Sequence, residues 1–401
     1  MTPAASFRTA GALAALAVWV LTGACAVRTR VDSVDAAVQR ALRFLVSRQS
    51  SDGAWRSEVY GGLKDGVALT PPILKLLRFA PVSDRGTRPA ITLGTRYLMS
   101  WVARDGKIRP EGQGLAFPVY AGALAAVVVG LDGRDAEHAR ARKAWLDYVL
   151  DYRLSSSLGW GPADAGFGGW GYSPHPPRRP ASGASSYEAN LSATVFGIAA
   201  LRQAGIAADD PVYGEIAAFV ERCQNFAAAP EQGDPRFDDG GFFFTPCDPA
   251  RNKAGGAGAD RFGRERFNSY GSATADGLRA LVRCGRSPRD PRVSSARRWL
   301  LGHFSAASNP GRFAPDREVL RDATYYYYAW SVAHAFMALD ERGAAATARA
   351  EALAREIVSR QQPDGSWRNR FTDAKEDDPL VATPLAAAAL VICRQTLEPR
   401  F

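Results

Sequence analysis

The segment VSRQSSDGAW at residues 46–55 returns near the other end of the chain as VSRQQPDGSW at residues 358–367. The two copies agree in Val, Ser, Arg, Gln, Asp, Gly and Trp, at an offset of 312 residues. Each copy ends a helical pattern and is followed by a Thr-Pro pair, Thr70-Pro71 and Thr383-Pro384. Because proline is tolerated at the first position of a helix, each pair predicts the start of a second helix. The recurrence therefore indicates an array of helix pairs.

Four weaker copies of the pattern lie between these two, which makes six units. The nearly all-apolar second helices are expected to be inner helices, and they begin near Thr70, Phe117, Glu188, Ser269, Thr324 and Leu380. Their amphipathic first partners run near 33–48, 88–103, 137–152, 210–226, 290–303 and 345–361. Helices that are apolar all round are buried, whereas helices with a charged face are exposed. The sequence thus predicts an all-α, single-domain α6/α6 toroid over residues 33–397. Ring closure would place Trp55 and Trp367 at adjacent turns. The best candidate strand is Gly241 to Phe244.

Composition narrows the class of protein. The 401 residues are 46% hydrophobic and 23% charged, with a net charge of +9, which is globular rather than disordered. Five cysteines and four histidines are too few for a disulfide scaffold or a multi-zinc protein. No phosphate-binding loop, dinucleotide fingerprint or metal-ligand spacing is present, and no stretch interleaves basic and aromatic residues. No cofactor, metal or nucleic-acid partner is therefore expected.

The first 25 residues predict export. An apolar run from Ala10 to Leu21, about 12 residues, is short of the about 20 that a membrane-spanning helix needs, and small residues follow it. Two endings remain open. Leu21 to Cys25 resembles a bacterial lipoprotein box in which Cys25 is lipidated, although the leucine is one place too early. Ala24-Cys25-Ala26 instead offers ordinary signal cleavage. Either ending predicts a location in the cell envelope or periplasm, with membrane attachment only through the lipid.

Gln49, Gly53 and Trp55, with Gln361, Gly365 and Trp367, resemble the QW repeat of the prenyltransferase and squalene cyclase family. The resemblance extends over nearly the whole chain and is strong only in the two outer copies. It implies the squalene-hopene cyclase type of terpenoid cyclase toroid. In that family the Gln and Trp side chains tie the turn of one repeat to a neighbouring helix, so they imply structure rather than catalysis.

The catalytic residues of the resembled families are missing. Hopene-type cyclases protonate an alkene with a D-x-D-D-T-A motif, and the matching segment in this chain, Tyr270 to Ala275, reads YGSATA. Thr274 and Ala275 agree, but all three acids are absent. Zinc prenyltransferases need an Asp-x-Cys pair on one inner helix and a histidine on the next. This chain has no Asp-x-Cys pair at the matching position, and tyrosines stand where the histidine would fall. Asp276 and Asp322 remain as fallback acids. The run Gly-Cys-Gly-Glu-Gln of thioester proteins is also absent. For a polysaccharide-active enzyme, Asp239, Asp377 and Asp378 are further candidate acids without a diagnostic spacing.

The parallel inner helices should bring their N-termini together at one mouth of the ring, where unpaired N–H groups favour an anion. The candidate ligand-pocket residues lie in these first turns: Tyr120, Asn190, Ser192, Tyr270, Ser272, Thr274, Tyr325 and Tyr328. Serine and threonine there also serve as helix caps. On one helix the four tyrosines 325–328 cannot all face inward, so Tyr325 and Tyr328 are expected to share the inner face, with Tyr326 and Tyr327 packed against neighbouring helices. Such tyrosines also fill ordinary cores. Five basic residues between Arg251 and Arg266 either form a rim over the mouth or a solvated loop. Cys223 and Cys247 are close enough in sequence to form a disulfide, but the sequence does not decide whether they do.

Two classes of function follow. The favoured one is an exported repeat protein whose apolar cavity binds an isoprenoid, a lipid or another hydrophobic ligand, without the known cyclase or zinc prenyltransferase chemistry. The alternative is an enzyme, either a non-standard terpene cyclase or prenyltransferase or a polysaccharide-active α6/α6 enzyme. A protein partner is also compatible with the sequence.

Overall fold

The computed structural model describes residues 31–81, 86–108, 115–132, 135–181 and 188–398. The predicted signal segment 1–25, including Cys25, lies outside these described residues. Within them, six helices form an inner ring: α2 Thr70–Phe79, α4 Pro118–Asp132, α6 Leu191–Ala204, α8 Gly271–Arg283, α11 Tyr325–Ala338 and α13 Pro379–Leu397.

Six further helices surround this ring: the first helix over residues 31–47, α3 Thr87–Ser100, α5 Ala136–Leu150, α7 Pro211–Arg222, α9 Pro291–His303 and α12 Ala344–Ser359. The described residues also contain the short helix α10 Val319–Ala323 and five single 3₁₀ turns, Gly61–Leu63, Ser156–Leu158, Pro230–Gln232, Pro249–Arg251 and Pro315–Arg317. These bounds lie within a few residues of the predicted ones.

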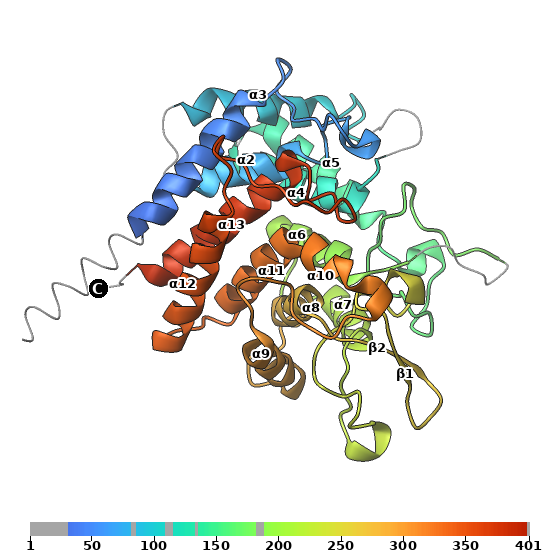
Figure 1. The fold of residues 1–401 in the computed structure, drawn as a ribbon. Coiled ribbons are helices and arrows are strands. Elements are labelled where there is room, and N and C mark those ends of the chain that lie inside the picture. Colours follow the sequence, from blue (N-terminus) through green and yellow to red (C-terminus); the bar gives the residue numbers. More distant parts are fainter. Residues whose placement is uncertain (1–30, 82–85, 109–114, 133–134, 182–187, 399–401) are drawn as a thin grey trace, which may run out of the picture.

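The inner helices contact one another in the order α2, α4, α6, α8, α11 and α13, and α13 packs against α2 to close the ring. In Figure 1 the red C-terminal helices accordingly lie beside the blue N-terminal ones. The predicted α6/α6 toroid is therefore confirmed. Helix α13 is long and apolar enough to span a membrane by length and composition, but 67% of its most apolar window is buried within the ring.

The repeated turns hold neighbouring units together. Trp55 is fully buried, and its indole N–H donates to the carbonyl of Leu45 at 2.6 Å. The Gln49 amide donates to the carbonyl of Ala90 on α3 at 2.9 Å. The first turn is therefore bound to the outer helix of the next unit.

The second copy repeats this arrangement across the ring closure. The Trp367 indole donates to Ile357, and the Gln361 amide donates to Ala37 on the first helix at 2.9 Å. Gln361 also accepts from Nε of Arg40 at 2.9 Å. The last unit is thus bound to the first one, as the closed ring requires.

A threonine near the start of four inner helices anchors the preceding turn. Its Oγ1 accepts from the backbone N–H at the tryptophan position, at 3.0 or 3.1 Å, in four pairs: Thr70 with Trp55, Thr194 with Trp170, Thr274 with Phe242, and Thr383 with Trp367. All four threonines are fully buried. The weak middle copies therefore keep the geometry of the repeat even where the sequence identity is lost.

The strand prediction was wrong in its location. Residues 241–244 make only an isolated bridge, between Gln224 and Phe242. The described residues contain one antiparallel hairpin instead, β1 Gly256–Ala259 with β2 Glu265–Phe267, inside the basic stretch. Asp260 closes its turn by accepting from the N–H groups of Phe262 and Arg264 at 2.9 and 3.0 Å. Residues 241–244 form no ladder because their backbone groups bond to different segments: Phe243 N–H donates to Cys223, and the carbonyls of Phe242 and Phe244 accept from Tyr270 and Leu191.

Candidate functional site

The N-terminal ends of the inner helices surround a cavity of about 460 Å³, which we call the mouth cavity. Its wall is mainly apolar and aromatic, formed by Leu63, Ala68, Leu69, Phe117, Tyr120, Tyr172, Phe196, Phe244, Tyr270, Ala273, Leu320, Tyr327, Leu380, Val381 and Leu385. The ionisable side chains in the wall are Arg251, Lys253, Asp276, Asp373, Lys375 and Glu376. A concave, largely apolar site with a few polar groups is typical of small-molecule binding.

Five predicted site residues line this cavity: Tyr120, Ser192, Tyr270, Ser272 and Asp276. The other predicted residues have different roles. Asn190 caps α6 by accepting from the N–H of Ala193 at 2.9 Å. Thr274 anchors the turn at Phe242 through its Oγ1. Neither of these two lines the cavity, because the capping and anchoring contacts turn their side chains into the repeat interface.

The tyrosine run is oriented differently from the prediction. The phenols of Tyr325 and Tyr328 donate to the carbonyls of Ala306 and Ser305, both at 2.9 Å, in the turn between α9 and α11. Tyr327, which was expected to pack against a neighbouring helix, lines the mouth cavity instead. Successive residues on a helix point about 100° apart, so the run can present only one of its central rings inward.

Asp276 on α8 is the carboxylate at the centre of the mouth cavity. It forms an ion pair with Arg279 at 2.7 Å, and both side chains are almost fully buried. The phenol of Tyr327 donates to its Oδ2 at 2.7 Å, and the hydroxyl of Ser331 donates to its Oδ1. Both oxygens of Asp276 are therefore engaged in contacts within the fold.

Arg279 continues the polar centre into an aromatic layer. Its guanidinium lies 4.2 Å from the ring centre of Trp330. Trp330 stacks on Phe196 with ring centres 5.6 Å apart, and Tyr120 meets Phe196 edge-on at 4.7 Å. Such rings favour a cation or an apolar surface at their faces. Tyr120 and Phe196 of this layer line the mouth cavity, whereas Trp330 does not.

Glu376 is a functional candidate that the sequence did not reveal. It precedes α13, lines the mouth cavity and is 1% exposed. Its two carboxylate oxygens accept from the N–H groups of Tyr326 and Tyr327, at 2.9 and 2.8 Å, at the N-terminus of α11. Burial raises the pKa of Glu376 to about 8, although these bonds act in the opposite direction. In the sequence it lies within the acidic run 376–378, where nothing distinguishes it from a surface residue.

The remaining candidate acids are placed elsewhere. Asp322 is exposed on α10 and does not line the mouth cavity, so it is not a cavity acid. Asp239 accepts from Trp299 at 3.0 Å, and Asp377 accepts from the Tyr60 phenol at 2.6 Å. Asp378 caps α13 by accepting from Leu380 at 2.8 Å. These three carboxylates have structural partners.

Only part of the basic stretch faces the mouth cavity. Arg251 and Lys253 line it, and Lys253 lies 3.8 Å from the ring centre of Phe244. Burial lowers the pKa of Lys253 to about 8. Arg264 and Arg266 form ion pairs with Asp260 instead, at 2.8 and 3.3 Å. The predicted basic rim is therefore reduced to two residues.

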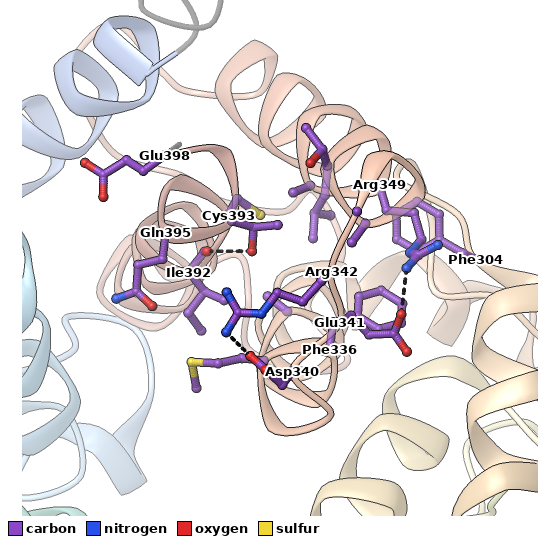
Figure 2. A pocket seen from close by; sticks show the side chains of 18 residues that line it. Phe304, Phe336, Asp340, Glu341, Arg342, Arg349, Ile392, Cys393, Gln395 and Glu398 are labelled. Atoms are coloured by element: carbon purple, nitrogen blue, oxygen red, sulfur yellow. Dashed lines mark hydrogen bonds and ion pairs between the residues drawn. The ribbon is translucent and has the colours of Figure 1, made fainter. Parts of the chain in front are cut away.

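Other features carry no comparable chemistry. Figure 2 shows a concavity of about 230 Å³ between α11, α12 and α13, where Arg349 pairs with Glu341 at 3.2 Å. Among the described residues, no three histidine, cysteine or acidic side chains gather as metal ligands would. Cys223 and Cys247 are both free thiols in the described part of the chain.

No known family model matches the sequence, and no curated protein matches it either. Solved structures do resemble the fold. A variant of the type II terpene cyclase MstE from Scytonema, in complex with merosterolic acid A as product, is 13% identical, with 92% of this chain and 99% of that chain covered and a TM-score of 0.56. Another MstE variant, in complex with the substrate geranylgeranyl dihydroxybenzoate, gives a TM-score of 0.53 at 13% identity and the same coverage.

The GH76A α-1,6-mannanase from Salegentibacter sp. HEL1_6 is similar to the same degree. It is 10% identical, with 91% of this chain and 100% of that chain covered and a TM-score of 0.55. At these identities the likeness shows the fold alone. The chain is therefore an α/α toroid of the architecture shared by terpene cyclases and this class of glycoside hydrolase, and function must be argued from the site.

Proposed function

We propose that the toroid binds a hydrophobic, isoprenoid-like ligand in the mouth cavity. The observation that carries the proposal is the combination of a mainly apolar and aromatic wall with a central carboxylate, Asp276, that is already neutralised by Arg279. The wall favours burial of a hydrocarbon chain. The oxygens of Asp276 are engaged by Arg279, Tyr327 and Ser331, so this side chain is held by contacts within the fold rather than directed at a ligand. The isoprenoid substrate in the MstE complex has the chemistry that such a wall accommodates.

The experiment measures binding of geranylgeraniol, a neutral isoprenoid, by calorimetry. We expect saturable binding that Ala273→Phe weakens at least about tenfold by filling the mouth cavity, where Ala273 is 2% exposed. The matched control is Ala218→Phe on the exposed face of α7, which should leave the affinity unchanged. Tyr327→Ala is a second variant, which removes a ring from the wall of the mouth cavity and should also change the affinity. Absence of saturable binding, or equal affinities in all variants, would overturn the proposal.

A second candidate function is enzymatic, with Glu376 as a general acid, and the burial of this carboxyl is the observation that favours it. With its pKa raised to about 8, this buried carboxyl holds a proton at neutral pH. Two N–H groups at the start of α11 would stabilise the carboxylate left after proton transfer. A carboxyl with such a pKa is too weak an acid to protonate an alkene, so an enzyme of this kind would transfer the proton from Glu376 to an oxygen atom of the bound ligand or of its leaving group.

Incubation with squalene and with farnesyl diphosphate, followed by mass spectrometry, separates the two functions. Binding without new products supports the binding protein. Products that disappear in Glu376→Gln, while geranylgeraniol binding persists, support the enzyme. Products that persist in Glu376→Gln would rule out Glu376 as the general acid. The exposed Asp322→Asn is the matched control in either case.

We also propose that the chain acts in the cell envelope, because the sequence of residues 1–25 has the pattern of an export signal. A hydrophobic ligand fits such a location, since lipid and isoprenoid chains are present at the membrane surface.

A further inference from the structure

A second cavity lies at the opposite end of the ring, where the inner helices end. This base cavity has a volume of about 250 Å³ and shares Tyr120, Phe196 and Leu385 with the mouth cavity. Three basic side chains face it from three helices: Lys75 on α2, Arg283 on α8 and His334 on α11. No aspartate or glutamate is among the described residues that line it.

The two strong bases of this cavity lack partners. Within the described residues, neither Lys75 Nζ nor the Arg283 guanidinium makes a hydrogen bond or an ion pair, whereas Arg279, one turn earlier on α8, is paired with Asp276. His334 uses Nδ1 in a 2.8 Å contact with the Trp330 carbonyl, which leaves Nε2 for another partner. Lys75 and Arg283 are half-buried, and cations that are withdrawn from water are ordinarily paired, because desolvation of an unpaired charge is costly.

The pKa values of the three basic groups in the base cavity are all lowered. Burial, together with repulsion from Arg283 and Arg279, lowers the pKa of Lys75 to about 8. Burial and repulsion by Arg279 lower the pKa of Arg283 to about 10, and burial holds the pKa of His334 well below its usual value. The fold thus places two like-charged groups, Lys75 and Arg283, in one apolar pocket, and a bound anion would relieve their repulsion.

The attraction of cations to helix C-termini does not explain why these three basic side chains gather in the base cavity. The negative C-terminal end of a helix attracts cations, but the effect fades within the last turn. Arg283 is in the last turn of α8, whereas Lys75 and His334 each lie more than one turn before the ends of α2 and α11. Two of the three groups therefore need another explanation.

The rest of the base cavity is suited to an apolar chain. Leu76, Leu124 and Val391 contribute to its wall. Phe79 and Met337 also line the cavity, and they are 53% and 46% exposed. Apolar wall, exposed apolar side chains and unpaired cations occur together at this one end of the ring.

We propose that the base cavity binds the oxyanion head of an amphiphile, a phosphate monoester or a carboxylate on an apolar chain, through Lys75 and Arg283. The two unpaired cations match the charge of such a head, and the chain packs against the apolar wall. The inference does not rest on the function proposed for the mouth cavity.

The test compares three ligands with the same chain, dodecyl phosphate, dodecanoate and dodecanol, by calorimetry at pH 7. We expect at least one anion to bind about tenfold or more tighter than the alcohol, as charge-assisted hydrogen bonds require. Lys75→Gln and Arg283→Gln should each remove most of that advantage while leaving dodecanol binding unchanged, and Lys75→Arg should retain it. Lys143→Gln, at an exposed site on α5, is the matched control.

Each outcome decides one point. The tighter of the two anions identifies the head group. Equal affinities for anions and alcohol, or anion binding that survives both Lys75→Gln and Arg283→Gln, would overturn the anion site. Because geranylgeraniol binding is tested separately through Ala273→Phe, its failure would leave the anion site standing, and failure of the anion site would leave the mouth cavity standing.

Discussion

The phenol of Tyr327 on α11 donates a 2.7 Å hydrogen bond to the carboxylate of Asp276 on α8. This contact joins two adjacent inner helices inside the mouth cavity. It also completes the set of donors around a carboxylate that Arg279 already neutralises. Two neighbouring inner helices are therefore joined by a buried carboxylate with partners on both of them.

Loss of one member of this pair should be strongly destabilising. Asp276→Asn leaves the Arg279 guanidinium buried without its counter-charge, which costs about 3–5 kcal/mol of unfolding free energy. The double variant Asp276→Leu with Arg279→Met removes both charges and should cost clearly less than the single one. Urea unfolding of the three proteins measures the difference. A double variant less stable than Asp276→Asn would contradict the pairing.

Glu376 should make stability depend on pH. Its folded pKa, about 8, lies above the ordinary value of 4.5, so the folded state binds more protons in this window. The contribution of Glu376 is complete below about pH 4.5 and is lost as the pH rises through about 8, with a slope of up to about 1.4 kcal/mol per pH unit. Glu376→Gln should flatten the stability curve relative to the wild type over that range. Parallel curves for the two proteins would show that Glu376 is charged throughout.

Ring closure can be tested through a glycine. Gly365 has φ +90°, and a Cβ there would lie 2.6 Å from the carbonyl oxygen of Arg40 on the first helix. Gly106 has a similar φ of +80° but open space around it. Gly106→Ala should therefore cost only the backbone strain, about 1–2 kcal/mol, and Gly365→Ala should cost about 2 kcal/mol more because the turn must move away. Equal melting temperatures would argue against the closing contact.

Lys75 should oppose the stability of the ligand-free protein. Its pKa of about 8, below the usual 10.5, means that the charged form is disfavoured in the fold. Lys75→Met should raise the unfolding free energy at pH 7 by about 1–3 kcal/mol, and the gain should shrink as the pH approaches 10.5, where the wild-type amine is increasingly neutral in both states. Thermal unfolding at pH 7 and pH 10 measures this. A destabilised Lys75→Met protein at pH 7 would mean that Lys75 has a structural partner.

Export predicts a shorter mature chain. Expression of the full chain in a bacterial host, followed by intact-mass measurement of the envelope fraction, should show either diacylglycerol on Cys25 or an unmodified chain that begins after the signal. Cys25→Ser should abolish the lipid form but not simple cleavage. Recovery of full-length protein from the cytosol would rule out both endings.

Several site features were beyond the reach of the sequence. Helical periodicity predicted that only one face of the tyrosine run points inward, but not which tyrosine lies on that face. The choice depends on where α11 begins and on the carbonyls of residues 305 and 306, which accept from Tyr328 and Tyr325. Glu376 belongs to a loop whose position over the start of α11 is set by the neighbouring unit. From the sequence, the threonines near the starts of the inner helices were interpreted as helix caps or ligand contacts. In the structure they anchor the preceding turn of the repeat.

The sequence by itself determined the repeat, the number of units, the helix bounds to within a few residues and the closed ring. It did so because the periodicity of apolar residues and the Gln, Gly and Trp positions are local properties of the chain. Only the tertiary structure decided which side chains share a cavity. Asp276 bonds to Tyr327, and Lys75 lines one cavity with Arg283 and His334, because the closed ring brings together helices that are far apart along the chain.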